Sequence, residues 1–96
     1  GGIMENIPRI LPNHLSAKIN KNSWKLPSLF QWLKDEANLD DAELYRTFNC
    51  GIGMTIIVDE KDAQEASNIL REFGEEVYII GSIKKLNKDE NQVEIT

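Results

Sequence analysis

Two runs of apolar residues on either side of an amphipathic segment constrain the fold of this chain most. Residues 54–58 form a continuous and mostly β-branched run, which is typical of a strand buried on both faces. A second apolar run covers residues 77–83. The segment between them, 61–73, has one apolar face at helical spacing and stops at Gly74. Together these segments predict a β-α-β unit with parallel strands and a right-handed crossover.

The rest of the chain predicts three further helices and two outer strands. Residues 3–11 have helical spacing, with Pro8 either kinking the helix or moving its start to Asn6. Alternation over 15–19 and 93–95 indicates half-buried strands, the second of which we expect to pair with 77–83 as an antiparallel hairpin. Two more helices are expected from Pro27 and from Asp40, which can cap its helix through Glu43.

These elements predict one α/β (α+β) domain over residues 1–96. We expect a mixed, four-stranded sheet with helices packed on it. The two continuous apolar strands should lie inside the sheet and the two alternating strands at its edges.

Composition excludes several classes of protein. A net charge of −5 argues against general nucleic-acid binding, which needs a basic patch. No apolar run approaches the roughly 20 residues of a membrane helix, and the start does not resemble a signal peptide. Cys50 is the lone cysteine and cannot form an internal disulfide. We therefore expect a cytoplasmic protein that acts without nucleic acid or membrane.

The first candidate binding segment is the start of the chain. Gly1 and Gly2 precede a helical pattern, and a helix N-terminus with free N–H groups attracts phosphate. Arg9 can add a bidentate contact to the same anion. The alternative is that the two glycines were added in cloning and that Arg9 is an ordinary surface residue.

The second candidate segment runs from Asn49 to Gly53. Gly51 and Gly53 allow positive φ or close backbone approach, and the Asn49 amide can recognise an amide or a hydroxyl. The alternative is a helix C-cap followed by a tight turn. Cys50 lies between Asn49 and Gly51. Because His14, the residue that could act as its base, is distant in sequence, we expect a structural thiol. No set of His and Cys residues predicts a metal site.

Both candidate segments resemble signature motifs of the AIR synthase family, ATP-dependent cyclo-ligases of purine biosynthesis. The first motif is Gly-Gly-Ile-Met-Glu-Asn-Ile-Pro-Arg-Ile-Leu-Pro at 1–12, and the second is Tyr-Arg-Thr-Phe-Asn-Cys-Gly-Ile-Gly-Met at 45–54. A Ser-Trp pair followed by Phe-x-Trp-Leu within 23–33, and Tyr-Ile-Ile-Gly at 78–81, fit in the same order. The resemblance spans nearly the whole chain and is weakest over 60–72 and after residue 84.

The resemblance implies a piece of an enzyme that converts formylglycinamidine ribonucleotide into aminoimidazole ribonucleotide. Family members have an N-terminal domain for ATP and for dimerisation, and this chain is similar to the later half of their C-terminal domain. ATP and Mg²⁺ should therefore bind mainly outside this chain. The full-length enzyme should be a homodimer, and this chain alone should be inactive. The family usually has a threonine and one more glycine before Gly1, so its first motif is cut short here.

The resemblance also places seven residues on the substrate side and identifies no catalytic residue. The backbone of Gly1 and Gly2, with Asn6 and Arg9, is expected to hold the ribose phosphate or to line the cleft. Asn49, Gly51 and Gly53 are expected to shape the cleft wall.

Three other functions remain open at this point. One is a related superfamily enzyme such as formylglycinamidine ribonucleotide synthetase. Another is a free-standing small-molecule-binding or regulatory module, because small α/β sheets often serve that purpose. The third is a pure interaction domain.

Overall fold

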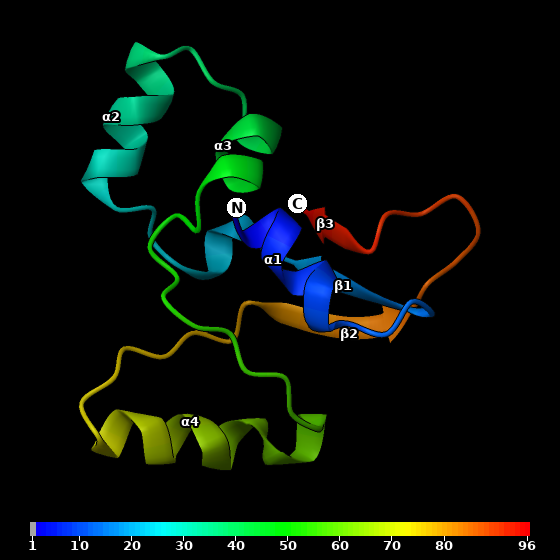
Figure 1. Ribbon diagram of the computed structural model, residues 1–96. Helices are drawn as coiled ribbons and strands as arrows, with labels where there is room; N and C mark the ends of the chain where they lie inside the picture. The colour runs from blue at the N-terminus through cyan, green and yellow to red at the C-terminus, as the bar shows by residue number, and fades with distance from the viewer. Residues whose placement is uncertain (1) are drawn as a thin grey trace.

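The computed structural model describes residues 2–96 and has a small sheet, three helices beside it and a fourth helix set apart (Figure 1). The elements follow in the order α1 (Ile3–Ile10), β1 (Leu15–Ile19), the 3₁₀ turn η1 (Lys21–Ser23), α2 (Ser28–Glu36), α3 (Asp41–Thr47), the 3₁₀ turn η2 (Glu60–Asp62), α4 (Ala63–Glu72), β2 (Gly81–Lys85) and β3 (Val93–Ile95). No helix among these residues is long and apolar enough to cross a bilayer.

The sheet of the described residues is mixed, as expected, but it has three strands in the order β2-β1-β3. β1 pairs antiparallel with β2, with Ala17 opposite Ile83, and parallel with β3, with Ala17 opposite Val93. The expected hairpin between the last two strands is therefore wrong, because β1 lies between them. The expected position of one alternating strand is also wrong, since β1 is central, whereas the other alternating strand, β3, lies at an edge as expected. The small β1 residues Ser16 and Ala17 are buried, which suits a strand covered on both faces.

The predicted strand at 54–58 does not form, and this accounts for the missing fourth strand. Residues 54–58 have no regular structure, and Met54 is 81% exposed. The run at 77–80 is likewise irregular, although the Ile80 carbonyl accepts a hydrogen bond from the Asn20 N–H at 2.8 Å. An apolar run becomes a strand only when another strand offers it a ladder. None of the described residues does so for 54–58.

Local signals set the helix ends as the sequence predicts. The Asp40 carboxylate accepts a hydrogen bond from the Glu43 N–H at 2.8 Å and caps α3. Gly74 follows Phe73, the C-cap of α4, and has φ +88°, a left-handed conformation that favours glycine. Pro8 lies inside α1, which begins at Ile3 rather than near Asn6.

The core lies between α1, α3 and the sheet. Its buried side chains include Ile3 and Ile7 from α1, Leu44 and Tyr45 from α3, and Trp24 after η1. The rings of Trp24 and Tyr45 meet edge to face, with centroids 6.1 Å apart. No apolar residue of α4 belongs to this core among the described residues. The core therefore fixes α1 against α3 and leaves α4 outside.

Candidate functional site

The two glycine-containing segments meet where α1 begins and α3 ends. The Gly2 N–H donates to the Arg46 carbonyl at 2.7 Å, and the Ile3 N–H donates to the Phe48 carbonyl at 3.3 Å. A Cβ atom at Gly2 would lie 2.5 Å from backbone atoms of Tyr45, Arg46 and Phe48. Gly2 is therefore required for close backbone packing, and its N–H already has an acceptor within the protein.

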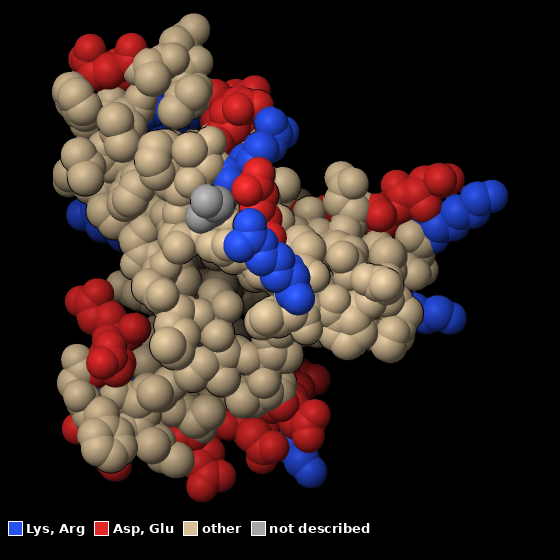
Figure 2. All heavy atoms as spheres, viewed as in Figure 1, with Lys and Arg blue, Asp and Glu red and all other residues tan. Residues whose placement is uncertain are grey.

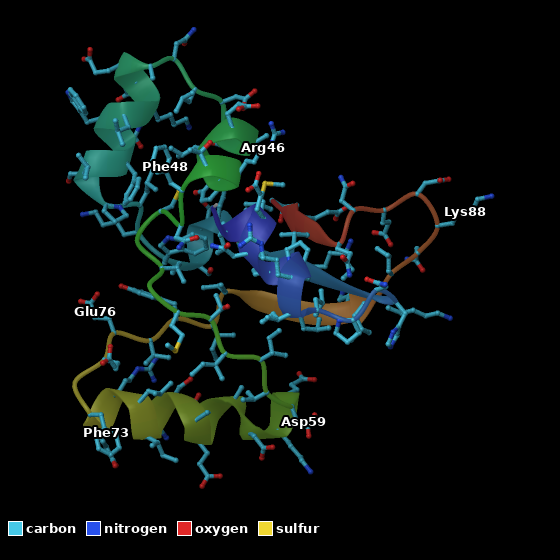
Figure 3. All side chains as sticks on the ribbon, in the orientation of Figure 1. Arg46, Phe48, Asp59, Phe73, Glu76 and Lys88 are labelled. Atoms are coloured by element: carbon cyan, nitrogen blue, oxygen red, sulfur yellow. The ribbon has the colours of Figure 1, made fainter. Side chains whose placement is uncertain are left out.

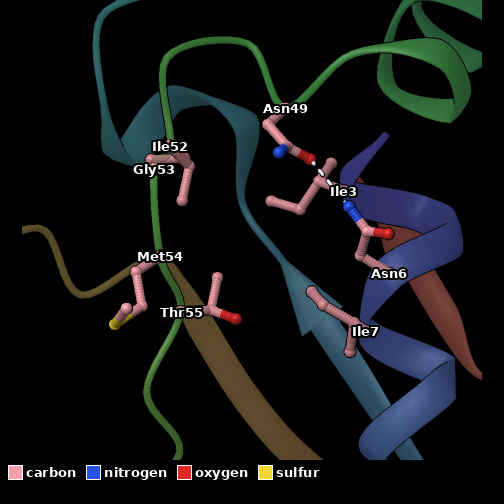
Figure 4. A pocket seen from close by; sticks show the side chains of 8 residues that line it. All are labelled: Ile3, Asn6, Ile7, Asn49, Ile52, Gly53, Met54 and Thr55. Carbon is pink, nitrogen blue, oxygen red and sulfur yellow. Dashed lines mark hydrogen bonds between the residues drawn. The ribbon is translucent and has the colours of Figure 1, made fainter. Parts of the chain in front are cut away.

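Asn6 and Asn49 are 43 residues apart in sequence and meet across a small hollow (Figure 4). The Asn6 Nδ2 donates to the Asn49 Oδ1 at 3.3 Å. The hollow has a volume of about 100 Å³ and lies between α1 and the segment that follows α3. It is lined by Ile3, Asn6, Ile7, Asn49, Ile52, Gly53, Met54 and Thr55.

The chemistry of the hollow is polar at one rim and otherwise apolar. The two amides offer donors and acceptors, the Thr55 hydroxyl adds one of each, and no lining residue carries a charge. Pockets that enclose a whole ligand have volumes of about 300–1,000 Å³. A hollow of about 100 Å³ can therefore form one wall of such a site but cannot enclose a nucleotide.

Gly51 and Gly53 have different structural roles. Gly51 has φ +98°, and a Cβ atom there would lie 2.6 Å from the Pro27 Cγ. It shapes the turn and does not line the hollow. Gly53 does line the hollow, and no atom lies within 4 Å of the position that its Cβ would take. Gly53 thus leaves open space on the side where a ligand can approach.

Cys50 is the buried residue of the turn between Asn49 and Gly51. Its side chain is fully buried, and its carbonyl accepts a hydrogen bond from the Trp24 Nε1 at 3.0 Å. Burial, with a smaller contribution from the Asp41 charge, raises the pKa of the Cys50 thiol to about 11. A thiol that stays protonated at neutral pH is a poor nucleophile, which supports the predicted structural role.

Arg9 lies outside the wall of the hollow. It is exposed in the last turn of α1, three residues after Asn6, so the two residues are neighbours on the helix surface. Gly1 lies outside the described residues. Of the seven predicted residues, the structure therefore brings Asn6, Asn49 and Gly53 together on the hollow.

Sequence reasoning missed the apolar residues of the wall. Ile3 and Ile7 were read only as one face of a helix, and Met54 only as the start of a buried strand. Their positions within the two motifs were the available signal, because one helical turn separates Ile3 from Asn6 and Ile7.

The described residues offer no group of three His, Cys, Asp or Glu side chains that could hold a metal ion. Oxygen ligands, above all carboxylates, are what Mg²⁺ requires, and the hollow contains no carboxylate. The donor set of this part of the chain therefore does not fit a magnesium site.

Comparison with known protein families identifies the fold. Residues 1–94 match the family model of the AIR synthase related protein, C-terminal domain. The chain belongs to this family. Both motif segments, which meet at the start of α1, lie within the matched region of the AIR synthase related domain.

Curated relatives of this AIR synthase related chain carry a consistent name. A phosphoribosylformylglycinamidine cyclo-ligase of Chromobacterium violaceum is 52% identical over 95 residues, which are 99% of this chain. Proteins of the same name from Neisseria meningitidis serogroups C and B are 50% identical over the same length. The chain spans 28% of the length of each of these relatives.

Proposed function

We propose that this chain is part of an ATP-dependent cyclo-ligase of de novo purine biosynthesis. The enzyme would convert formylglycinamidine ribonucleotide into aminoimidazole ribonucleotide. One observation carries the proposal: Asn6 and Asn49 meet over a hollow in a chain that is 52% identical to a protein named phosphoribosylformylglycinamidine cyclo-ligase. The synthetase, the regulatory module and the interaction domain have no comparable support.

The proposed role of this chain is to form the substrate-side wall. In the proposed reaction, an amidine nitrogen attacks the formyl carbon, the bond from that carbon to the activated oxygen breaks, phosphate leaves and the imidazole ring closes. Bound ATP supplies the phosphoryl group that activates the formyl oxygen. A ring closure of this kind depends on holding the reacting groups close together. A wall that binds the substrate in one orientation would contribute to this positioning.

We assign residue roles within that wall according to their placement. Asn6 and Asn49 contact polar groups of the substrate, and Gly53 leaves room for it. Gly2 and Gly51 hold the surrounding backbone in place. The motif resemblance assigns Arg9 and Gly1 to the ribose phosphate, and Arg9 would reach it from the rim.

The partners follow from the size and chemistry of the wall. The hollow is smaller than a nucleotide, and the donors suit no magnesium ion. We therefore propose that ATP and Mg²⁺ bind mainly to the remainder of a full-length enzyme, which would be a cytoplasmic homodimer. This chain alone should give no turnover with substrate, ATP and magnesium, and turnover above background would contradict its role as one wall only.

Arg9→Ala in the full-length enzyme tests the assignment. Loss of a charge-assisted contact worth about 1.5–3 kcal/mol should raise the KM for the ribonucleotide by about 10-fold or more. The matched control is Lys25→Ala, which removes another exposed cation away from the hollow. Unchanged KM and kcat for Arg9→Ala would refute the phosphate contact. A full-length enzyme that produces no aminoimidazole ribonucleotide would refute the function itself.

A further inference from the structure

The turn 49–52, which follows α3, has two consecutive residues in the left-handed backbone region. Cys50 has φ +55° and Gly51 has φ +98°, and the Ile52 N–H donates to the Asn49 carbonyl at 3.1 Å. Positive φ at both central positions is characteristic of type I′ turns, which favour glycine, asparagine or aspartate there. A cysteine in this conformation costs free energy, and such strain persists only where the surrounding structure holds it.

Trp24, which is 26 residues earlier in the sequence, contacts the strained residue directly. Its Nε1 donates to the Cys50 carbonyl at 3.0 Å, and the bond is buried. Edge-to-face packing against Tyr45 orients the indole ring. The Cys50 carbonyl belongs to the central peptide group of the turn, between the two residues with positive φ. The indole therefore holds the peptide group on which the left-handed conformation depends.

The start of α2 packs along the same turn. A Cβ atom at Gly51 would lie 2.6 Å from the Cγ of Pro27, the residue that precedes α2. The rings of Phe30 and Phe48 have centroids 5.7 Å apart, and Phe48 lies between α2 and α3 (Figure 3). These contacts limit the movement of the turn on the side of α2.

Charge does not hold this turn. Residues 49–52 are uncharged, and uncharged atoms cover the surface between the end of α3 and α4 (Figure 2). Among the residues that the structure describes, only Trp24 donates a side-chain hydrogen bond from outside the turn to the turn's backbone. The contact from Trp24 is thus the directional one, whereas the others are packing contacts.

The conformation of the turn determines where the Asn49 amide lies. Asn49 is the first residue of the turn, and its Oδ1 accepts the hydrogen bond from Asn6 at the hollow. A rotation of the central peptide would break the closing hydrogen bond of the turn and displace Asn49. We propose that Trp24 is a positioning residue of the substrate-side wall, because its hydrogen bond to Cys50 holds the turn and thereby fixes the Asn49 amide at the hollow. This inference rests on the proposed substrate contact of Asn49.

Trp24→Phe in the full-length enzyme tests the hold on the turn, since it removes the indole N–H and keeps an aromatic ring. The turn should open more often, so the fully buried Cys50 thiol should react with iodoacetamide about 10-fold faster. Mass spectrometry of the peptide that contains Cys50 measures the rate. The matched control is Trp32→Phe, with Trp32 58% exposed on α2, and it should leave the rate unchanged. An unchanged rate in Trp24→Phe would overturn the proposal.

A double-mutant cycle separates positioning from a general loss of stability. Trp24→Phe should raise the KM for formylglycinamidine ribonucleotide by about 3- to 10-fold and change kcat by less than about 2-fold, because a binding contact is weakened. In an Asn49→Ala background the same change should raise the KM no further, since the residue through which Trp24 acts is gone. Equal factors in the two backgrounds would overturn the proposal. An enzyme that converts no ribonucleotide would refute the proposed function, and the alkylation rates would still test the hold of Trp24 on the turn.

Discussion

The core around α1, α3 and the sheet differs sharply from the segment 53–79. The core contains every buried apolar residue among the residues that the structure describes. All ion pairs among these described residues also lie outside 53–79. Segment 53–79 has apolar side chains that are just as large, but Ile56, Phe73 and Ile79 are more than half exposed. Hydrophobic composition alone therefore does not distinguish the two regions.

The difference teaches that burial depends on partners that the rest of the chain supplies. β1 finds β2 and β3 on its two sides, and α1 finds α3. Residues 54–58 find no strand among the described residues, so their backbone groups form no strand ladder there. The core should consequently carry most of the stability.

Leu44→Ala should produce the largest effect. Leu44 is fully buried in α3, and removing such a side chain costs about 2–5 kcal/mol in the free energy of unfolding. The matched variant Ile79→Ala, with Ile79 59% exposed, should change it by less than about 0.5 kcal/mol. Urea unfolding followed by tryptophan fluorescence measures both. Equal losses for the two variants would break the distinction between core and segment 53–79.

Gly2→Ala should produce the next largest loss of stability. The new Cβ would lie 2.5 Å from three backbone atoms at the end of α3, so α1 must shift at a cost of about 1–3 kcal/mol. Gly53→Ala is the control within segment 53–79, because its Cβ would meet no atom within 4 Å. Thermal unfolding by circular dichroism should show a lower Tm for Gly2→Ala only. A normal Tm for Gly2→Ala would contradict the close packing of the two motifs.

Cys50 gives the core a characteristic pH dependence. Burial raises the pKa of its thiol in the folded state from about 9 to about 11. The thiol therefore stabilises the fold fully below pH 9, and up to about 2 kcal/mol is lost as the pH rises toward 11. Urea unfolding at a series of pH values measures this loss. In Cys50→Ala the thiol contribution should vanish, and an unchanged profile would show that another group causes the slope.

Asp41→Asn should have the smallest effect. The Asp41 carboxylate pairs with the Lys21 Nζ at 2.6 Å and with the Lys34 Nζ at 2.7 Å. The hydrogen bond with Lys21 contributes most, and the one with Lys34 next, to lowering the pKa of Asp41. Because all three side chains are about one-third exposed, the loss should stay below about 1 kcal/mol. The stabilisation is present at neutral pH and disappears as the pH falls below about 4. A variant as stable as the wild type at pH 7 would show that these pairs contribute nothing.

The sequence predicted features that depend on neighbouring residues. The strand 15–19, the Asp40 cap and the end of α4 at Gly74 were correct because each is set within a few residues. The predicted pairing of strands was wrong. The local sequence favours a hairpin between β2 and β3 as much as it favours their placement on either side of β1. Only the pairing of β1 with both of these strands in the folded chain decides between them.

The candidate site divides in the same way. Asn6, Asn49 and Gly53 were identified from residue chemistry and motif resemblance, and the structure brings them to one hollow. Gly51 was expected to allow positive φ or close backbone approach, and it has φ +98°, yet its place under Pro27 and away from the hollow depends on distant contacts. Arg9 was grouped with Asn6 by sequence, but helical geometry directs it to the rim.

The sequence by itself determined the family, the helix ends and the residue types available to a binding wall. The tertiary structure alone decided which strand is central, which glycine lines the hollow and which apolar runs stay exposed. The physical reason is that capping and periodicity are local, whereas burial and strand pairing require groups that are distant in sequence to meet.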